Sequence, residues 1–481
     1  MSIASALSSA ASGLAAVTRG TEVVAGNVAN ALTPGYTRRE IVLAGLADGG
    51  GVRIAAVERI VSAALIGDHR IAGAAQGFSG TVATFRSAME TAIGVPGDGT
   101  SLVDRVSDLE AALLSAASRP DNEVRLGAVR LAAGALVSGI NTAASAVEDA
   151  RTSADEGISA DVTRLRSALK DVARLNRSII IDRANGRDAA TLMDERQRTI
   201  DSIADIVAIR EVPRDNGRIA LFTAGGATLL DGDEPIDLQF SSAGRVTALM
   251  EVETPPVGRL MMNGEPVGDS LMSLFAGGSL QANFAIRDTL APEVQAGLDA
   301  MARDLVERFA DPALDPTLAT DDPGLFTDAG AATSSASERG LANRLSLTAQ
   351  LAADGSGDWR LRDGLGATIA GDVGRSTQLS ALADRLMASR QTASTGVSPG
   401  SRSVAAFAST LSSQASTARV QSANAQARDA AHVDALNSDL LADGVDTDQE
   451  MQRLLGLEKA YAANARVIRA ADEMIARILE I

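Results

Sequence analysis

The sequence predicts a mainly α-helical protein, in which both chain termini form a long helical bundle or coiled coil and a small antiparallel β domain is inserted. Three observations predict this class. Apolar residues recur with heptad-like spacing at both ends of the 481-residue chain, a long central segment lacks proline, and short strand-like runs bounded by turn residues follow it. Aromatic residues make up only 2% of the chain. The cores must therefore be filled by Ala, Leu, Val and Ile, which favours closely packed helices.

The first thirty residues carry an apolar seam in which the spacing alternates between four and three positions. Its members are Ile3, Leu7, Ala10, Leu14, Val17, Thr21, Val24, Val28 and Ala31. Such a seam predicts an amphipathic helix that must be buried against another helix. Pro34-Gly35 ends the pattern, and we expect loop and short extended pieces over residues 37–60.

Four helices are predicted in the next part of the chain. Their ranges are about 59–92, 102–118, 122–181 and 188–206. We expect Asp121 to be the N-cap of the third helix, because its carboxylate can accept from orphan backbone N–H groups. This helix contains no proline and would be a rod of roughly 90 Å if unbroken, although Gly139 and Gly157 could interrupt it.

The pattern changes near Val207, where runs of strand length alternate with turn residues such as Asp215-Asn216-Gly217 and Asn263-Gly264. This alternation is typical of hairpins. It predicts a small β domain over 207–270, with one strand at 245–252. After this region the chain is expected to be helical again, apart from one irregular segment. The helices are predicted at about 280–309, from about 376, and at about 402–441, and the irregular segment at 311–340.

The last helix opens with Thr447-Asp448-Gln449-Glu450, which predicts a capping box between the threonine hydroxyl and the glutamate carboxylate. A second apolar row follows, again spaced by three and four. Its members are Leu454, Leu457, Tyr461, Asn464, Ile468, Ala471, Ile475 and Ile478. An asparagine at a seam position costs stability but fixes the register or the partner. Alternatively, Asn464 lies at the rim of a broad apolar face.

The two terminal seams have two interpretations. They pair within one chain as an ordinary helical domain, or they form an assembly domain with neighbouring copies. The Ala, Ser and Gly residues of the first helix favour the second interpretation, because small side chains let helix axes approach closely and leave an isolated helix weakly stable.

Composition excludes several classes of function. The chain has 44 Lys and Arg against 61 Asp and Glu, a net charge of −17, so it is a poor candidate for binding nucleic acid or an anionic membrane surface. It has no Cys, which excludes disulfides, thiol nucleophiles and Cys-ligated metals. No run of apolar residues approaches the length of a membrane span, so we expect no membrane insertion.

We expect neither catalysis nor a bound cofactor or metal. The two histidines, His69 and His432, are expected to be solvated surface residues. Asp321-Asp322 and Asp446-Thr447-Asp448 do not continue into a calcium-binding loop. The sequence also lacks the H-E-x-x-H and G-x-S-x-G motifs.

Motifs at both ends resemble those of bacterial flagellar axial proteins. Asn27-Val28-Ala29-Asn30, followed by Thr33-Pro34-Gly35-Tyr36-Thr37-Arg38, is similar to the family's Asn-Ile-Ala-Asn helix end and Thr-Pro-Gly-Tyr turn. Ala460-Tyr461, the stretch 464–468 and the stretch 471–474 are similar to its C-terminal helix.

Within these axial proteins, the form of the turn resembles the hook-associated protein 1 family, which lies at the hook–filament junction. Leu192-Met193-Asp194-Glu195-Arg196-Gln197 resembles that family's Leu-Leu-Asp-x-Arg-Asp segment, and Gly277-Gly278-Ser279-Leu280 resembles its Gly-Gly-x-Leu segment. The chain departs from the pattern at two places. Arg39 stands where the family often has Gln, and Glu458-Lys459 replaces the usual Gln pair.

The resemblance implies a secreted structural protein of the extracellular flagellum that joins hook to filament by helical or ring-like self-assembly. It implies export without a cleaved signal peptide. The implied partners are other copies of the chain, hook subunits, the next junction protein, the flagellar type III export apparatus, and an export chaperone at the C-terminal region. Two alternatives remain: another axial subunit of the hook or rod, or a secreted enzyme carried on an axial scaffold.

Together, the patterns and the resemblance predict three domains. Residues 1–58 plus 436–481 form a terminal coiled-coil assembly domain that lines an inner tube. Residues 59–206 plus 280–435 form an elongated helical domain with the irregular excursion at 311–340, and residues 207–279 form an outward-facing β domain. The predicted assembly interface comprises Leu7, Leu14, Val17, Val24, Asn27, Val28, Asn30, Pro34, Gly35, Tyr36, Leu454, Leu457, Tyr461, Asn464, Ile468, Ala471, Ile475 and Ile478.

Overall fold

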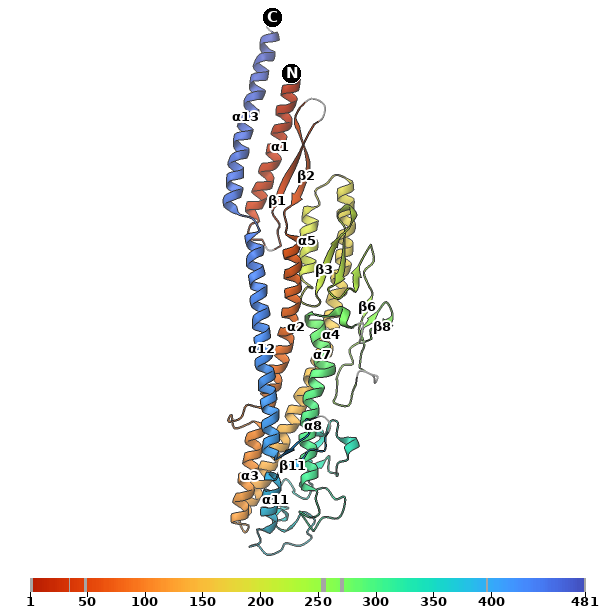
Figure 1. Ribbon diagram of the computed structural model, residues 1–481, viewed down its shortest axis with the longest axis vertical. Coiled ribbons are helices and arrows are strands. Elements are labelled where there is room, and N and C mark those ends of the chain that lie inside the picture. Colours follow the sequence, from red (N-terminus) through yellow and green to blue (C-terminus); the bar gives the residue numbers. More distant parts are fainter. Residues whose placement is uncertain are drawn as a thin grey trace.

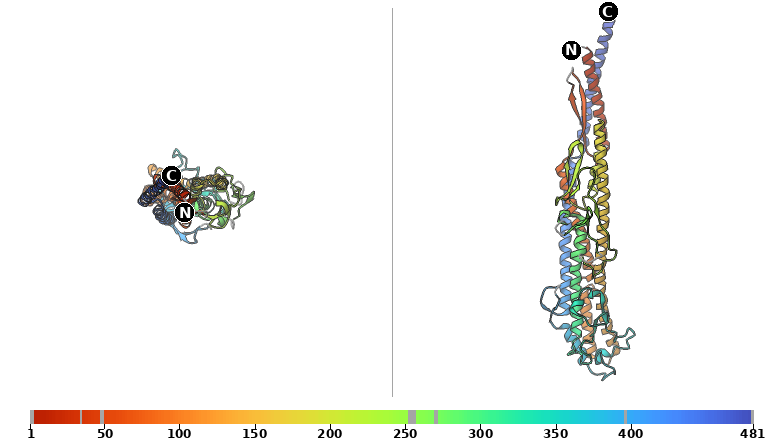
Figure 2. Two further views of the ribbon diagram at one scale, coloured as in Figure 1. Left: turned by 90° about the horizontal axis from the view of Figure 1, so that it is seen from above. Right: turned by 90° about the vertical axis from the view of Figure 1, so that its right-hand side faces the viewer.

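The computed structural model is an elongated rod, with both chain termini at the same end (Figures 1 and 2). It describes residues 3–33, 35–46, 50–251, 257–268, 272–394 and 397–479. Long helices run along the rod and the small sheets lie beside them (Figure 1). The predicted fold class, mainly α with an inserted small β region, is confirmed.

The end that carries the termini consists of two helices and one hairpin. Helix α1 (Ile3–Ala29) packs antiparallel to α13 (Thr447–Leu479), and the two strands β1 (Arg39–Gly45) and β2 (Val52–Arg59) lie along α1 (Figure 1). The extended pieces expected within 37–60 thus form one antiparallel hairpin. We call α1, the hairpin and α13 the terminal module.

Five helices of the body precede or follow the β region and its returning column in the sequence. They are α2 (Ala63–Ile93), α3 (Leu102–Ser118), α4 (Glu123–Ala184), α5 (Ala190–Asp201) and α12 (Val404–Ala442). The cap predicted at Asp121 is wrong, because the Asn122 side chain accepts from the backbone N–H groups of Val124 and Arg125. The side-chain oxygen one residue later is therefore the group that faces the first turn of α4.

Helix α4 runs through 62 residues without a break, which at 1.5 Å per residue is about 90 Å. Gly139 and Gly157, which could have interrupted this helix, lie within it without a break. A Cβ added at Gly139 would lie 2.7 Å from Cδ of Arg105, and one at Gly157 would lie 2.7 Å from Nδ2 of Asn283. Both positions thus serve close side-chain packing against the helix.

The inserted β region consists of two small three-stranded sheets. One is ordered β3-β4-β5, from β3 (Ile209–Pro213), β4 (Ile219–Thr223) and β5 (Thr228–Leu230). The other is ordered β6-β7-β8, from β6 (Leu238–Gln239), β7 (Met261–Met262) and β8 (Glu265–Pro266).

The strand predicted at 245–252 is wrong over the described residues 245–251, which are irregular. Side chains of α4 take the place of a partner strand. Arg151 donates to the carbonyls of Thr247 and Met250 at 2.7 and 2.8 Å, and Glu148 accepts from the N–H of Ala248 at 2.9 Å. Because these backbone groups are satisfied by side chains, the segment needs no ladder.

After the β region the chain returns as one helical column. It comprises α7 (Gly278–Ala285), a π-helical turn (Ile286–Leu290) and α8 (Ala291–Phe309). The π turn presents Arg287, which is buried and pairs with the buried Asp155 of α4 at 2.7 Å. The extra residue of a π turn re-aims a side chain, and here it brings a charge to the middle of the rod.

The far end of the rod is built from short elements around α3, α8 and α11. These elements are β9 (Phe326–Asp328), α9 (Leu341–Arg344), β10 (Leu345–Leu347), α10 (Arg360–Asp363), α11 (Thr377–Met387), β11 (Arg390–Gln391) and β12 (Ser401–Arg402). Two 3-10 turns, at 215–217 and 273–275, belong to the β region, and a third lies at 335–337 in the far end. The segment predicted to be irregular, 311–340, contains only β9 and the last of these turns.

Two apolar cores stabilise the body. One joins α2, α3, α4, α8 and α11 at the far end, and the other joins α4 and α5 to the β region. Part of α4 is long and apolar enough to cross a membrane, with a mean hydropathy of 1.3, but 44% of that stretch is buried within the rod. It has the character of a core helix.

Candidate assembly site

The pairing of α1 with α13 follows a seven-residue step. Asn27 bonds to Glu450, Gly20 lies against Leu457, and Gly13 lies against Asn464. Each step of seven along α1 is matched by a step of seven in the opposite direction along α13. This is the repeat of an antiparallel coiled coil, and it fixes the register of two segments 423 positions apart.

Two glycines set the separation of the helices. A Cβ added at Gly13 would lie 2.9 Å from Nδ2 of Asn464, and one at Gly20 would lie 3.0 Å from Cδ2 of Leu457. Both glycines have helical backbone, so close packing is the reason for them. Asn464 therefore lies in the seam within one chain, facing the glycine of the Ser12-Gly13 pair.

Asn27 is the centre of the polar contacts at the base of the seam, where its side chain is fully buried. Its Nδ2 donates to the carbonyl of Arg39 and to Oε2 of Glu450, both at 2.9 Å. Its Oδ1 accepts from the hydroxyl of Tyr36 at 2.9 Å and from the N–H of Arg39 at 3.0 Å. One amide side chain thus joins α1, the turn, β1 and α13, with all four of its hydrogen-bonding positions used.

Glu450 has a different role from the predicted one. Its carboxylate is buried and faces Asn27, Arg453 at 2.9 Å and Arg38 at 3.6 Å. The capping box predicted at 447–450 is therefore wrong. Oδ1 of Asp446 caps α13 instead, accepting from the N–H groups of the two residues after Thr447 at 2.9 and 3.1 Å. A buried carboxylate needs cationic and hydrogen-bonding partners, and the seam provides them.

Tyr36 responds to the same surroundings. Burial raises the pKa of its phenol; the carboxylates of Asp194 and Glu450 raise it further, and Arg39 opposes them. The hydroxyl therefore stays protonated and donates to Asn27. The Arg39 guanidinium also lies 5.0 Å from the centre of the Tyr36 ring.

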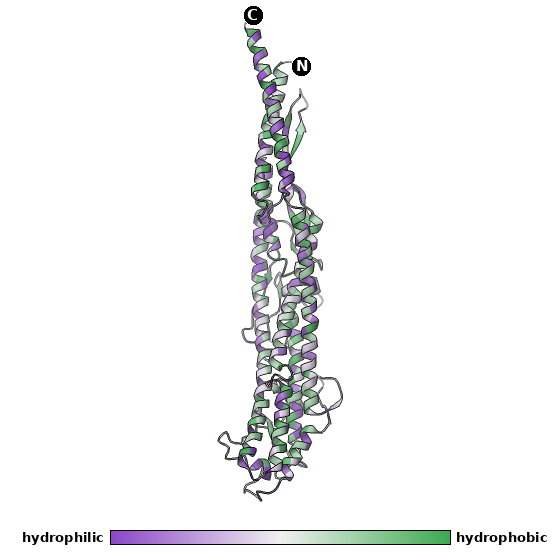
Figure 3. Cartoon of the chain, turned by 90° about the vertical axis from the view of Figure 1, so that its left-hand side faces the viewer, coloured by the Kyte–Doolittle hydropathy of each residue, from purple (hydrophilic) through white to green (hydrophobic). Residues whose placement is uncertain are grey.

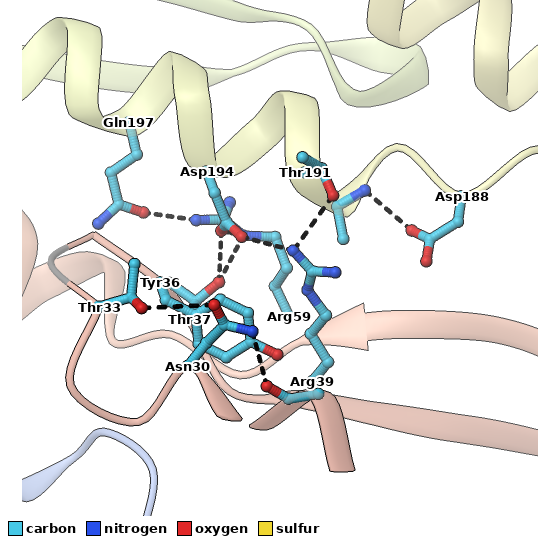
Figure 4. A network of polar contacts seen from close by, with 12 residues as sticks. Asn30, Thr33, Tyr36, Thr37, Arg39, Arg59, Asp188, Thr191, Asp194 and Gln197 are labelled. Atoms are coloured by element: carbon cyan, nitrogen blue, oxygen red, sulfur yellow. Dashed lines mark hydrogen bonds and ion pairs between the residues drawn. The ribbon is translucent and has the colours of Figure 1, made fainter. Parts of the chain in front are cut away.

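A second group of polar contacts joins the hairpin to α5 (Figure 4). Oδ1 of Asp194 accepts from Thr37 at 2.6 Å and from Nε of Arg59 at 2.8 Å, while Oδ2 accepts from Arg39 at 2.8 Å. Arg59 also donates to Gln197 at 2.5 Å. We call Asp194, Thr37, Arg39 and Arg59 the carboxylate clamp. Burial lowers the pKa of Arg59, and the charge of Asp194 opposes that shift.

The predicted interface residues differ widely in exposure. Four are buried: Val17, Val24, Asn27 and Ala471. Ten are partly buried: Leu7, Leu14, Val28, Asn30, Gly35, Tyr36, Leu454, Leu457, Asn464 and Ile468. Three are exposed: Tyr461, Ile475 and Ile478. Pro34 lies outside the described residues.

An apolar row remains open on α13. Besides the three exposed residues just named, its members are Leu455, Val467 and Met474, each more than a third exposed. Hydrophobic turns recur along α13 towards its end (Figure 3). Contiguous exposed apolar residues on a helix mark an interaction surface, so the terminal module of one chain leaves part of its apolar surface uncovered.

The sequence patterns did not identify some residues of this site. Gly20 has no signal in a heptad pattern, because it has no apolar side chain and lies beside the predicted seam members Val17 and Thr21. Arg59 lies 22 positions from Thr37 in an unremarkable strand. Asp194 stood in the segment 192–197 that resembled a family motif, and that resemblance was the only available signal.

The described residues contain no group of three or more His, Asp or Glu side chains placed to hold a metal ion. His432 is exposed, as expected. The expectation for His69 is wrong, because its ring is partly buried and its Nε2 has no hydrogen-bond partner among the described residues. It lies in the wall of a cavity of about 430 Å³ where α2 and α12 meet the turn after α1.

Comparison with known proteins adds two family matches. Residues 87–312 match the model of the flagellar hook-associated protein FlgK helical domain, and residues 441–481 match that of the flagellar basal body rod FlgEFG protein C-terminal region. A solved structure, the flagellar hook junction protein FlgK from Burkholderia pseudomallei, is 20% identical with a TM-score of 0.45. The match covers 55% of this chain and 46% of that one, less than half of its length. A search of curated proteins finds no match.

Proposed function

Because the chain belongs to the flagellar hook-associated protein family, we propose that it is a structural subunit of the bacterial flagellum that joins hook to filament. The observation that carries this proposal is the match of residues 87–312 to the hook-associated helical domain. The match at residues 441–481 is to a C-terminal region named for rod proteins, so it supports an axial protein without separating its types.

The geometry supports assembly through the terminal module. Its two helices already pair within the chain, yet the exposed row on α13 leaves apolar surface uncovered. Burying that row against neighbouring copies would gain about 25 cal/mol for each Å² removed from water. Self-assembly through the interface residues predicted from the sequence is therefore part of the proposal.

The same proposal includes the individual binding partners of the chain. Contacts with hook subunits and with the next junction protein would be made at the assembled module. Export through the flagellar type III apparatus would deliver the chain outside the cell, and an export chaperone would bind the C-terminal region before export. In this scheme residues 207–279 would face outward from the assembled tube.

The alternative of a hook or rod subunit is less well supported, because neither type accounts for the helical-domain match at 87–312. An enzymatic role has no support from the charged residues of the rod. Two that are buried, Arg287 and Asp155, pair with each other in the interior, which is the arrangement of a structural ion pair.

Deletion of the gene in the parent bacterium tests the junction role. Electron microscopy of the cell surface and an assay of the medium for filament subunits should show hooks without filaments and filament subunits lost to the medium. Complementation with the full chain should restore filaments. Normal filaments in the deletion strain, with no second copy of the gene, would refute the proposal.

A further inference from the structure

The terminal module and the body of the rod meet at a narrow joint. The chain crosses the joint twice, once between β2 and α2 and once between α12 and α13 (Figure 1). Side-chain contacts of two kinds bridge it beside these crossings. One is the carboxylate clamp, whose two arginines also donate to Thr191 and Gln197 of α5; the other is an ion pair between Arg19 and Asp188 at 3.6 Å. The ion pair is the weaker of the two, because both of its side chains are substantially exposed.

The clamp has an unusual arrangement of charge. Arg39 and Arg59 stand directly opposite each other at the base of the hairpin. Two like charges across neighbouring strands repel each other, and both side chains are largely buried. The two oxygens of Asp194 are divided between them, one for each guanidinium. A single carboxylate from the body thus pairs with two arginines of the terminal module and offsets part of their repulsion.

We propose that Asp194 is a positioning residue, which fixes the orientation of the terminal module relative to the body by holding Arg39 and Arg59 together. When the carboxylate is in place, the hairpin base and α5 are held in one orientation. When it is removed, two facing guanidiniums remain, and their repulsion favours opening of the joint. The relevance of this orientation to assembly rests on the proposed function, but the clamp itself is a property of the single chain.

Arg39 gives the clamp its second positive charge. A glutamine here could still bond to Asp194, but it would leave one guanidinium on the carboxylate instead of two. Arg39→Gln should therefore loosen the joint less than Asp194→Ala does, while leaving the backbone bonds between Asn27 and residue 39 unchanged.

Distance measurement between two spin labels tests the clamp in the full-length monomer. The chain has no cysteine, so Thr18→Cys on α1 and Ser167→Cys on α4, both exposed positions, give one label on each side of the joint. Double electron–electron resonance should show one narrow distance distribution for the otherwise unchanged chain. Asp194→Ala should move roughly half of the molecules or more into a broad second population.

The matched control is Glu195→Ala. Glu195 is adjacent and its ion pair, with Arg174 at 3.8 Å, lies within the body, so this change should leave the distribution narrow. An unchanged distribution in Asp194→Ala would overturn the proposal. If that variant loses helical structure, Asp194→Asn decides, because it keeps the shape of the side chain and removes its charge: a broadened distribution supports the clamp, and an unchanged one refutes it. Because no assembly is involved, failure of this test would not bear on the junction role, and the deletion experiment would not bear on the clamp.

Discussion

Replacing Asn27 with alanine should selectively destabilise the terminal module. The change removes four hydrogen bonds: two with the backbone of Arg39, one with Tyr36 and one with Glu450. At about 1 kcal/mol for each of the three neutral bonds and about 1.5 kcal/mol for the bond to the carboxylate, the local loss is about 4.5 kcal/mol. Glu450 keeps Arg453 as a partner, so the loss should not grow to the larger cost of an unpaired buried charge.

Hydrogen exchange of backbone amides measures this loss where it occurs. A change of about 4.5 kcal/mol corresponds to exchange that is about two-thousandfold faster in α1 and α13. If the amides of the unchanged module are protected by less than that factor, the amides of the Asn27→Ala variant should exchange at the rate of free peptide. Amides of α4, in the body, should keep their protection, because no contact of Asn27 reaches α4.

Asn30→Ala is the matched control, because it changes the same residue type one turn later in the same motif. Asn30 is partly exposed and makes two local contacts, to the carbonyl of Gly26 and from the hydroxyl of Thr33. Its loss should be about 1 kcal/mol, or roughly a fivefold change in exchange. Equal effects of the two substitutions, or a loss of protection in α4 equal to that in α1, would refute the reasoning.

Three further predictions concern the body, the exposed row and pH. Gly77→Ala should destabilise the chain by about 1–3 kcal/mol in thermal melting, because the new Cβ would overlap the carbonyl oxygen of Asp205. Gly73→Ala, with open space around it, should stabilise the chain by up to about 1 kcal/mol. The opposite order of the two stabilities would contradict this packing. Val467→Asp should change the free energy of unfolding of the monomer by no more than about 0.5 kcal/mol. The same change should abolish assembly as seen by sedimentation and electron microscopy. Normal assembly of this variant would exclude the row from the interface. Burial raises the pKa of Asp161 above its ordinary 3.8, so its ionisation lowers stability as pH rises. The melting temperature of Asp161→Asn relative to the unchanged chain should therefore rise from about pH 4 to about pH 7, and a constant difference would refute the assignment.

The long helices were predictable because their signals are local. Apolar spacing, the absence of proline and the polar residues at helix ends determine segments such as α3, whose range agrees with the prediction, and α4. The errors arose where distant side chains replaced local partners. The segment 245–251 has the alternation of a strand, but Arg151 and Glu148 of α4 satisfy its backbone. Residues 447–450 have the sequence pattern of a capping box, but the Glu450 carboxylate accepts a hydrogen bond from Asn27 of α1 instead.

The candidate site was predictable in its location and not in its contacts. The two terminal seams and the motif at Asn27 predicted a site at the end of the molecule where α1 and α13 pair. The seven-residue step depends on glycines that carry no hydrophobic signal, and the clamp joins positions 155 and 135 apart in the sequence. Such pairings follow from how the body folds, so no local pattern contains them.

The bond between Asn27 and Glu450 also constrains the order in which the molecule forms. It closes a loop of 423 positions, and closing so long a loop is entropically unfavourable until the intervening chain is compact. In the body, α2 packs against the distant helix α12, and this pairing brings the two ends of the chain together, so the body should fold before the terminal module. A chain truncated before Glu450 could complete the body but not the terminal module. Formation of the terminal module would then report that the chain has been made at least as far as Glu450.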